Sequence, residues 1–292
     1  MEIAFHIGAN CTDDDRLLKS VTRNLPGLAE QGIRAPNPAR YRRLLREAIQ
    51  HLRGEAPEPG TRDVLIDAIL EHGETTERLV LGNPAFICTP ARIFDAGRFH
   101  DLAGFKARSL RALFPDDRIE MFLGIRNPAA FVPACWDQAR GRGVDAFMAG
   151  TDPRGILWSD VVARLREAAP DIRLTVWCDE DSALLWPDLV RALAGMAEDA
   201  PVEGGQDLVN EIMRPEGTAR LRAYLAAHPP ATAAQHRRVV SAFLDKYARA
   251  EAVETEIDMP GWNAALVAEL TAIYETDLER IAAMDGVRLL RA

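Results

Sequence analysis

Four short apolar segments alternate with stretches of helical periodicity over residues 1–181, and this alternation constrains the fold more than any other feature. The segments comprise residues 2–7, 78–82, 120–125 and 173–178. Their composition suits strands that are buried on both faces, as in parallel sheets. Strand and helix in this order require right-handed crossovers, so we expect an α/β fold whose parallel sheet of about four to five strands carries helices on both sides.

The remainder of the chain is different in character, because it shows helical patterns almost to its end. The clearest are residues 232–254 and 261–284, and residues 287–290 are a candidate edge strand. We find no internal repeat, low-complexity tract or long linker. We therefore expect one domain over residues 1–292, in which 1–181 contain the sheet and 182–292 form a mainly helical extension packed on it.

Composition excludes several classes of protein. A formal charge of −9 argues against nucleic acid as the main partner, because phosphate binding depends on Lys and Arg. No apolar run is long enough for a transmembrane helix, and the chain begins in a strand-like segment without the pattern of a signal peptide. Four well-separated cysteines fit a reducing compartment, so we expect a cytoplasmic protein without a membrane partner. Only three lysines accompany 32 arginines, which is typical of a GC-rich bacterial genome.

The architecture itself predicts where a ligand would bind. In open parallel sheets, ligands occupy the crevice beyond the carboxyl ends of the strands, where the strand order reverses. The residues that follow the four predicted strands are 10–16, Asn83, Arg126 with Asn127, and Asp179 with Glu180. Arg126 stands directly after an apolar strand, where a guanidinium needs an anionic partner. That partner is either a ligand or a carboxylate such as Asp14 or Asp15.

Two short segments resemble the P-loop sulfotransferases. Residues 5–9, Phe-His-Ile-Gly-Ala, resemble the start of that family, whose first strand runs into a Gly-x-x-Lys-x-Gly-Thr-Thr loop. Residues 123–128, Leu-Gly-Ile-Arg-Asn-Pro, are similar to the second signature, in which an Arg followed by Asn or Asp and Pro opens a helix. The spacing of the two segments and the helix around residues 270–274 are also similar to the family.

The resemblance implies a fold of the P-loop nucleotide-binding type and a 3′-phosphoadenosine 5′-phosphosulfate donor. The reaction would be sulfuryl transfer to a carbohydrate or small hydroxyl acceptor, with Arg126 at the donor's 3′-phosphate. An anionic nucleotide or carbohydrate is therefore the expected partner. The donor-binding positions carried over from the family are Gly8, Ala9, Asn10, Cys11, Thr12, Arg126 and Asn127.

The chain departs from the family at the residues that perform the chemistry. Cys11 stands where the catalytic lysine belongs, Asp13, Asp14 and Asp15 replace Gly-Thr-Thr, and Ala134 replaces a Ser. A shifted register places Ala9 at the lysine position instead. A like-charge contact at about 4 Å costs several kcal/mol at an effective protein dielectric, so three carboxylates oppose a bound dianion.

Without the lysine, a catalytic base has to come from His6, Asp14 or Glu180. Three functions stay open. The first is sulfuryl transfer at a weakened anion site. The second is a non-catalytic binding or scaffold protein on the same fold. The third is a transferase that uses carboxylates with a metal ion, so whether the chain is an enzyme is left undecided.

Other clusters have structural interpretations that we favour. The three aspartates are candidate ligands of Mg²⁺, but neighbouring residues on a helix diverge. We expect a helix from about Asp13, with Thr12 or Asp13 as its cap and the other carboxylates in its first turn. The cysteines follow strands and could converge for metal or oxidation chemistry, but buried cysteine is usually a core residue, so no metal is expected. The arginines at 40, 42, 43 and 46 are either a glycan site or a solvated face paired with Glu47 and Asp67, and we favour the latter.

Overall fold

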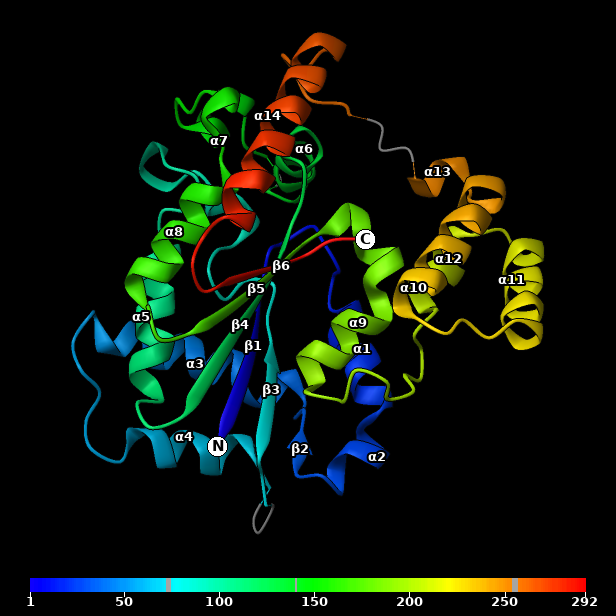
Figure 1. Cartoon of the computed structure of the whole chain (residues 1–292). Helices are drawn as coiled ribbons and strands as arrows, with labels where there is room; N and C mark the ends of the chain where they lie inside the picture. Colours follow the sequence, from blue (N-terminus) through cyan, green and yellow to red (C-terminus); the bar gives the residue numbers. More distant parts are fainter. Residues whose placement is uncertain (72–74, 140, 254–256) are drawn as a thin grey trace.

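One parallel sheet of six strands organises the chain, in the order β2-β3-β1-β4-β5-β6 (Figure 1). The structure is a computed structural model that describes residues 1–71, 75–139, 141–253 and 257–292. Every pairing between neighbouring strands is parallel. The strands are β1 (Glu2–Gly8), β2 (Ile33–Arg34), β3 (Arg78–Gly82), β4 (Arg118–Ile125), β5 (Arg173–Cys178) and β6 (Val287–Leu290).

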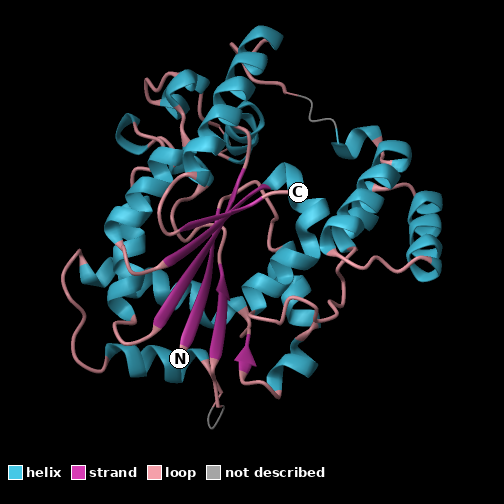
Figure 2. Cartoon of the chain, in the orientation of Figure 1, coloured by secondary structure: helices cyan, strands magenta, loops and turns pink. Residues whose placement is uncertain are grey.

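The predicted α/β class with a helix-flanked parallel sheet is confirmed, and the four apolar segments form its central strands (Figure 2). The sheet is wider than expected because both edges carry a short strand. β2 has only two residues, too few to show any periodicity, and it pairs with β3 through Ile33 and Arg34. The proposed edge strand β6 pairs with β5, which returns the end of the chain to the sheet.

The two faces of the sheet have separate cores, as the alternation of side chains along a strand requires. From β1, Ile3 and Phe5 enter one core and Ala4 enters the other. The first core is covered by α3 (Pro38–Leu52), α5 (Ala103–Leu113) and α8 (Trp158–Ala168). The second is covered by α1 (Arg16–Arg23) and α9 (Ser182–Ala194). Helices therefore pack on both faces of the sheet.

Within the C-terminal extension, the middle helices form a small lobe with a core of its own, drawn in yellow and orange at the right of Figure 1. That core contains Val209, Met213, Leu221, Val240 and Tyr247. The lobe consists of α10 (Asp207–Ile212), α11 (Pro215–Ala227), α12 (Ala233–Tyr247) and α13 (Ala250–Val253), and it packs on α9.

The remaining helices are α2 (Leu25–Ala29), α4 (Thr61–Ile69), α6 (Pro128–Gln138), α7 (Val144–Met148) and α14 (Ala264–Ala282).

Two predicted helix boundaries were wrong. The helix expected over 232–254 ends at Tyr247, because Ala248 is extended and forms a β-bridge with Met213; residue 254 lies outside the described residues. The helix expected from Asp13 begins at Arg16 instead. Asp14 and Asp15 have positive φ angles of 47° and 65°, a conformation that Asp tolerates better than most residues. The aspartates thus form a turn before the helix.

Asp277 joins α14 to the sheet domain through the start of α8. Its side chain is 1% exposed and accepts hydrogen bonds from the Ser159 amide, at 2.9 Å, and from the Ser159 hydroxyl. These bonds satisfy donors at a helix N-terminus, which have no partner within the helix. Loss of the carboxylate would leave them buried and unsatisfied.

We predict that Asp277→Ala lowers the free energy of unfolding by about 2–4 kcal/mol, because it removes a charged acceptor and leaves a cavity. Urea denaturation followed by circular dichroism measures the change. Glu275→Ala, an exposed acid on the same helix, is the matched control and should change stability by less than about 0.5 kcal/mol. Equal effects of the two substitutions would contradict the role given to Asp277.

Candidate functional site

The strand order reverses between β1 and β4, which are neighbours in the centre of the sheet. From β1 the chain passes to β2 on one side, and from β4 it passes to β5 on the other. The carboxyl ends of these two strands (Figure 1) therefore mark the position at which open parallel sheets bind ligands, called the crevice below. Residues 9–15 follow β1, Arg126 and Asn127 follow β4, and Asp179 and Glu180 follow β5.

Backbone contacts hold the loop after β1 against the end of β4. The Ala9 amide donates to the Gly124 carbonyl at 2.9 Å, and Arg126 Nη1 donates to the Cys11 carbonyl at 2.9 Å. A side chain at Gly124 would collide with the Trp177 ring, since a Cβ there would lie 2.9 Å from it. The Thr12 hydroxyl donates to the Ala9 carbonyl at 2.7 Å, which closes the loop on itself. The structure thus brings the two segments that resemble the sulfotransferase signatures into direct contact.

Six consecutive amides of this loop donate no hydrogen bond of good geometry to the described part of the chain, although residues 10 and 11 form a turn. They belong to residues 10 to 15, and the next amide, that of Arg16, donates to the Asp13 carbonyl. Cys11, Asp14 and Asp15 all have positive φ, so the backbone curves repeatedly along this stretch. Successive amides in such a curved backbone form a concavity that suits an anion. The amides also precede α1, whose dipole favours negative charge at this end.

Asp15 is compensated by an ion pair, and Asp13 is buried with one backbone donor. Asp15 accepts two hydrogen bonds from Arg42, at 2.6 and 2.9 Å, and Arg42 Nε also donates to the Gly82 carbonyl at the end of β3. Asp13 is 2% exposed; one of its oxygens accepts from the Leu17 amide at 3.1 Å and the other lies 3.3 Å from His6 Nε2. Two of the three carboxylates are therefore directed away from the loop's amides.

Asp14 is the remaining carboxylate, and it lies on the surface of the loop. Partial burial of its carboxyl group raises its pKa, and the charges of Asp13 and Asp15 act in the same direction. Arg16 and Arg126 oppose this shift. The proposed base Asp14 is thus close to the crevice, and part of its population is protonated at a pH where an ordinary Asp is charged.

His6, also a proposed base, lies beneath the loop and is fully buried. Its ring packs 5.6 Å from the Trp177 ring, and its Nε2 faces Asp13. Neither ring nitrogen makes a hydrogen bond of good geometry to another described atom. In this arrangement His6 supports Asp13 from the core side of the loop and does not reach the crevice.

Glu180 and Asn127 hold α14 over the end of the sheet. Glu180 accepts the Asn127 amide at 2.7 Å and the Tyr274 hydroxyl at 3.3 Å. The Asn127 side chain donates to the Thr271 hydroxyl at 2.9 Å and accepts the Ala129 amide at 3.0 Å, which caps α6. Both residues meet at the predicted edge, but their polar atoms serve these internal contacts.

Asp179 directly precedes Glu180 and was not among the three candidate bases. Burial raises the pKa of Asp179 to about 7; Arg126 opposes the shift, and Glu180 and Asp13 add to it. A carboxyl group that titrates near neutrality beside a guanidinium can donate or accept a proton under cellular conditions. Its position as the first residue after β5 was the available signal, since that position is closer to the strand end than Glu180.

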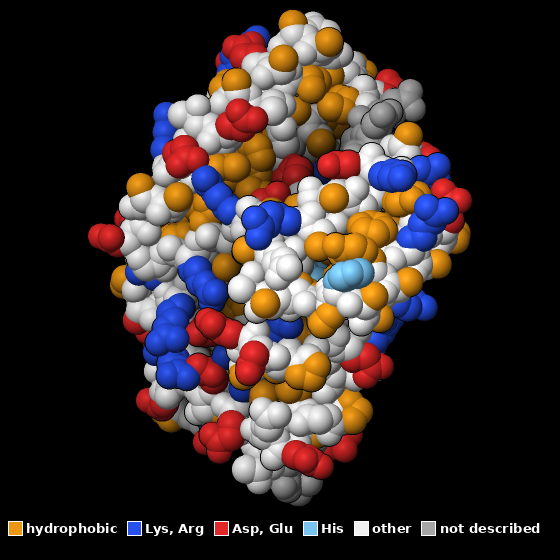
Figure 3. Space-filling view, turned by 45° about the vertical axis from the view of Figure 1, so that its right-hand side comes forward, with side chains coloured by type: hydrophobic (Ala, Val, Ile, Leu, Met, Phe, Trp, Pro, Cys, Tyr) orange, Lys and Arg blue, Asp and Glu red, His pale blue; other side chains and the backbone are white. Residues whose placement is uncertain are grey.

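A cleft of about 450 Å³ opens beside Glu180, between the start of α9 and the helices of the lobe. Leu184, Ile212 and Leu244 contribute apolar walls, and Asp245 and Arg249 contribute charge. Figure 3 shows this face of the molecule hollowed, with acidic side chains at the floor of the hollow and hydrophobic ones around it. A small molecule bound there would lie next to the acids that follow β5.

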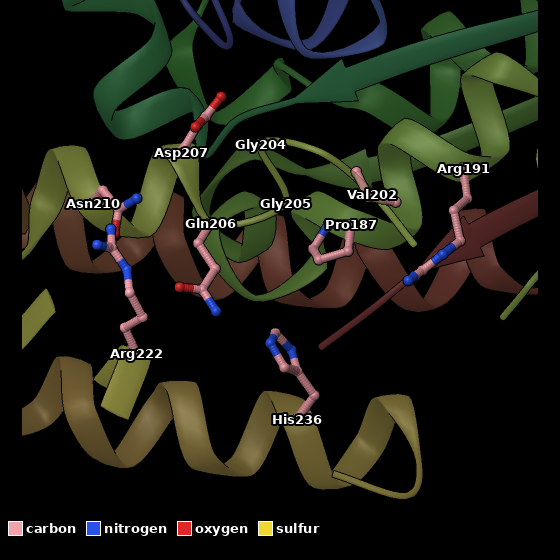
Figure 4. Close-up of a pocket in the computed structure, with 10 residues that line it drawn as sticks. All are labelled: Pro187, Arg191, Val202, Gly204, Gly205, Gln206, Asp207, Asn210, Arg222 and His236. Atoms are coloured by element: carbon pink, nitrogen blue, oxygen red, sulfur yellow. The ribbon is translucent and has the colours of Figure 1, made fainter. Parts of the chain in front are cut away.

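A second cleft, of about 420 Å³, lies within the extension and shares no lining residue with the crevice (Figure 4). Gln206 and Asn210 point into it from one side and Arg222 and His236 from the other. Its other arginine, Arg191, donates to Asp188 at 3.1 Å and to the Ala200 carbonyl at 2.8 Å. None of the residues that follow the central strands lines this cleft, so the candidate site remains the crevice between β1 and β4.

The other clusters have separate partners. Arg40 pairs with Glu71 and Arg43 with Glu47, whereas Arg42 turns to Asp15 of the loop, a contact that no sequence pattern indicated. The Sγ atoms of Cys11 and Cys135 lie 3.5 Å apart, and all four cysteines are reduced. Over residues 1–71, 75–139, 141–253 and 257–292, no three His, Cys, Asp or Glu side chains are gathered as metal ligands.

Comparisons with known proteins give two similarities. No model of a protein family matches the chain. One component of an ATP-dependent helicase/deoxyribonuclease of Pelotomaculum thermopropionicum is 29% identical over 164 residues, which cover 52% of this chain but only 13% of that protein. A sulfotransferase from Alicyclobacillus acidocaldarius aligns with a TM-score of 0.37 and 15% identity, over 82% of this chain and 97% of that one. The fold class therefore rests on the strand order and helical layers of the chain itself.

The helices were also compared with the length and apolarity that a lipid bilayer demands. In the described portion of the chain, none of them meets both requirements for crossing a membrane.

We predict that Arg42→Ala destabilises the fold by about 1–2 kcal/mol, because it leaves Asp15 uncompensated beside two other carboxylates. Thermal and urea denaturation measure the loss. Arg43→Ala, which removes an exposed guanidinium one residue further along α3, is the control and should have little effect. In the double variant Arg42→Ala/Asp15→Asn, much of the stability should return; its failure to return would show that the charge of Asp15 is not the cause.

A pH dependence follows from Asp179. Its pKa is about 7 in the folded chain, above the ordinary value of 3.8, so the unfolded chain releases this proton first as the pH rises. Protonated Asp179 makes its full contribution to the free energy of unfolding when the pH is below 3.8. This contribution declines as the pH rises from 3.8 to about 7.

We therefore predict that Asp179→Asn is more stable than the parent chain at pH 8, by an amount on the order of 1–2 kcal/mol after allowance for solvent screening. At pH 4 the two proteins should unfold at the same denaturant concentration. Urea titrations at the two pH values test this, and a stability difference that does not change with pH would contradict it.

Proposed function

We propose that the chain is a divergent sulfotransferase-like protein that binds an anionic nucleotide in the crevice between β1 and β4. The observation that carries the proposal is the run of six loop amides without a hydrogen bond of good geometry, which lies beside Arg126 in the described structure. Backbone amides at a helix N-terminus and a neighbouring guanidinium are the groups that hold phosphate and sulfate oxygens.

The charge of the three aspartates, which opposes an anion when judged from sequence, is partly compensated. Asp15 is paired with Arg42 and Asp13 is buried beneath the loop with His6. The pKa of Asp14 is raised, so a proton taken up on ligand binding would reduce its repulsion. The site is thus weaker than one without acids, but the carboxylates do not exclude an anion.

If the protein transfers a group, Asp179 is our candidate for the general base in place of the three considered from sequence. When bound, 3′-phosphoadenosine 5′-phosphosulfate supplies the sulfuryl group. Arg126 and the loop amides hold its anionic oxygens, and Asp179 accepts the proton of the acceptor hydroxyl. The pKa of Asp179, about 7, matches that task at neutral pH.

The cleft beside Glu180 supports a small acceptor rather than a polysaccharide. Its volume of about 450 Å³ suits a molecule of modest size, and Leu184, Ile212 and Leu244 favour one with an apolar portion. The carboxylates of Glu180 and Asp245 outnumber the guanidinium of Arg249 there, so a second anionic group is disfavoured. We therefore expect a small hydroxyl compound that is uncharged or cationic.

Binding without catalysis is the second candidate function, and Cys11 supports it. This residue stands where the resembled family has its lysine, and its thiol contacts Cys135 instead of a ligand. The loop contains no lysine, so the leaving phosphate would lack its usual cation. An assay for transfer of labelled sulfate from the donor to a panel of small hydroxyl compounds separates the two functions, because only the first predicts turnover.

We predict that adenosine 3′,5′-bisphosphate binds the chain and that Arg126→Ala weakens binding by at least about tenfold, since a charged contact to phosphate is lost. Asp14→Asn should have the opposite effect and strengthen binding several-fold, because it removes a like charge. Isothermal titration calorimetry measures both constants.

Arg108→Ala, an exposed substitution on α5, is the control for loss of a positive charge and should leave the affinity unchanged. Absence of heat at millimolar ligand would refute the nucleotide site. Equal weakening by Arg108→Ala and Arg126→Ala would show that general charge, not the crevice, attracts the ligand.

A further inference from the structure

Two thiols from distant parts of the sequence touch directly beneath the proposed ligand loop. Cys11 belongs to the loop after β1 and Cys135 to α6, and their Sγ atoms are 3.5 Å apart. Cys135 is fully buried, whereas Cys11 is 7% exposed. We infer that Cys11 and Cys135 form a reversible disulfide when a hydroperoxide oxidises the protein, and that this bond alters the loop.

The other two cysteines show what distinguishes this pair. The Cys88 thiol donates to the neighbouring Thr89 carbonyl at 3.1 Å, and burial raises its pKa to about 12. Burial likewise raises the pKa of Cys178 to about 11. Neither thiol is in contact with a second sulfur among the described residues. Core packing alone explains Cys88 and Cys178, but the approach of two sulfurs across 124 residues is specific to Cys11 and Cys135.

The surroundings assign different roles to the two sulfurs. Burial raises the pKa of Cys135 well above its ordinary value; Cys11 and, more weakly, Cys88 add to the shift, while Arg126 opposes it. Cys135 is therefore suited to react second, as the resolving thiol. Cys11 is the more exposed of the two, and its carbonyl accepts a hydrogen bond from Arg126 at the edge of the crevice. A small oxidant would meet Cys11 first.

The chemistry consumes one hydroperoxide for each pair of thiols. The Cys11 thiolate attacks the terminal oxygen of ROOH, the O–O bond breaks, and the RO⁻ fragment leaves as ROH with the thiol's proton. Cys11 is then a sulfenic acid. The Cys135 sulfur attacks the Cys11 sulfur, and the S–O bond breaks as the S–S bond forms. The hydroxide takes the Cys135 proton and leaves as water. Two thiols are oxidised to one disulfide, and the peroxide is reduced.

We expect formation of this bond to move the loop. A disulfide bond is about 2.05 Å long, so the two sulfurs must approach further than their present separation of 3.5 Å. Cys11 has a φ of 57° and its carbonyl is held by Arg126, so a displacement of its Cα on bonding would disturb a curved backbone that this contact holds. The neighbouring amides of residues 10 and 12 would shift with it. This consequence rests on the proposed function, whereas formation of the disulfide does not.

The test exposes the folded full-length chain to hydrogen peroxide, then alkylates the remaining thiols and maps peptides by mass spectrometry. We expect a Cys11–Cys135 cross-link that dithiothreitol reverses, with Cys88 and Cys178 still alkylated. The matched variants Cys88→Ser and Cys178→Ser should form the same cross-link. Cys135→Ser should instead leave Cys11 as a sulfenic acid that dimedone traps, and circular dichroism verifies that each variant is folded. Oxidation that consumes thiols without this cross-link, or that joins the four cysteines indiscriminately, overturns the inference.

Calorimetry with adenosine 3′,5′-bisphosphate on reduced and oxidised protein tests the effect on the loop. We expect the cross-linked form to bind at least about tenfold more weakly, and dithiothreitol to restore binding. Unchanged affinity in the cross-linked form overturns the effect on the loop. If the reduced protein does not bind the nucleotide, the proposed function fails, while the mass-spectrometric result still decides whether the disulfide forms.

Discussion

Three consecutive carboxylates at the carboxyl edge of a buried sheet impose the constraint on which the rest of the site depends. Each must be paired, buried with a donor or exposed to water, because uncompensated charges this close repel strongly. Asp15 is paired with Arg42, Asp13 accepts the Leu17 amide beside His6, and Asp14 reaches the surface. These three arrangements accompany the turn that the aspartates form and the start of α1 at Arg16.

The same compensation determines what the crevice offers to a ligand. The amides of residues 10 to 15 keep no hydrogen bond of good geometry within the described chain, and Arg126 supplies positive charge from the end of β4. The field of Asp13 and Glu180 reaches Asp179 and helps to raise its pKa, despite the opposing charge of Arg126. Acidic and basic groups at this edge therefore act as one coupled set, in which a change at one residue alters the protonation of the others.

Elements with a strong local signal were predictable, and those with a weak one were not. The buried central strands are continuous apolar runs, and the Asn-Pro step after β4 marks the start of α6, where Asn127 serves as the cap. β2 has too few residues for a periodic pattern. The start of α1 was misplaced because helix rules favour acids in the first turn, whereas positive φ at Asp14 and Asp15 depends on contacts with Arg42 and the sheet.

By itself, the sequence determined the class of fold and the edge of the sheet at which a site should lie, because buried parallel strands need apolar runs and their carboxyl ends must share one edge. Only the tertiary structure decided which side chains face that edge. His6 is buried beneath the loop, Glu180 and Asn127 are engaged with α14, and Asp179 is buried near Arg126 with a raised pKa. The contact of Cys11 with Cys135 was equally hidden, since it joins residues 124 positions apart. Such contacts arise from packing between elements, which local sequence patterns do not encode.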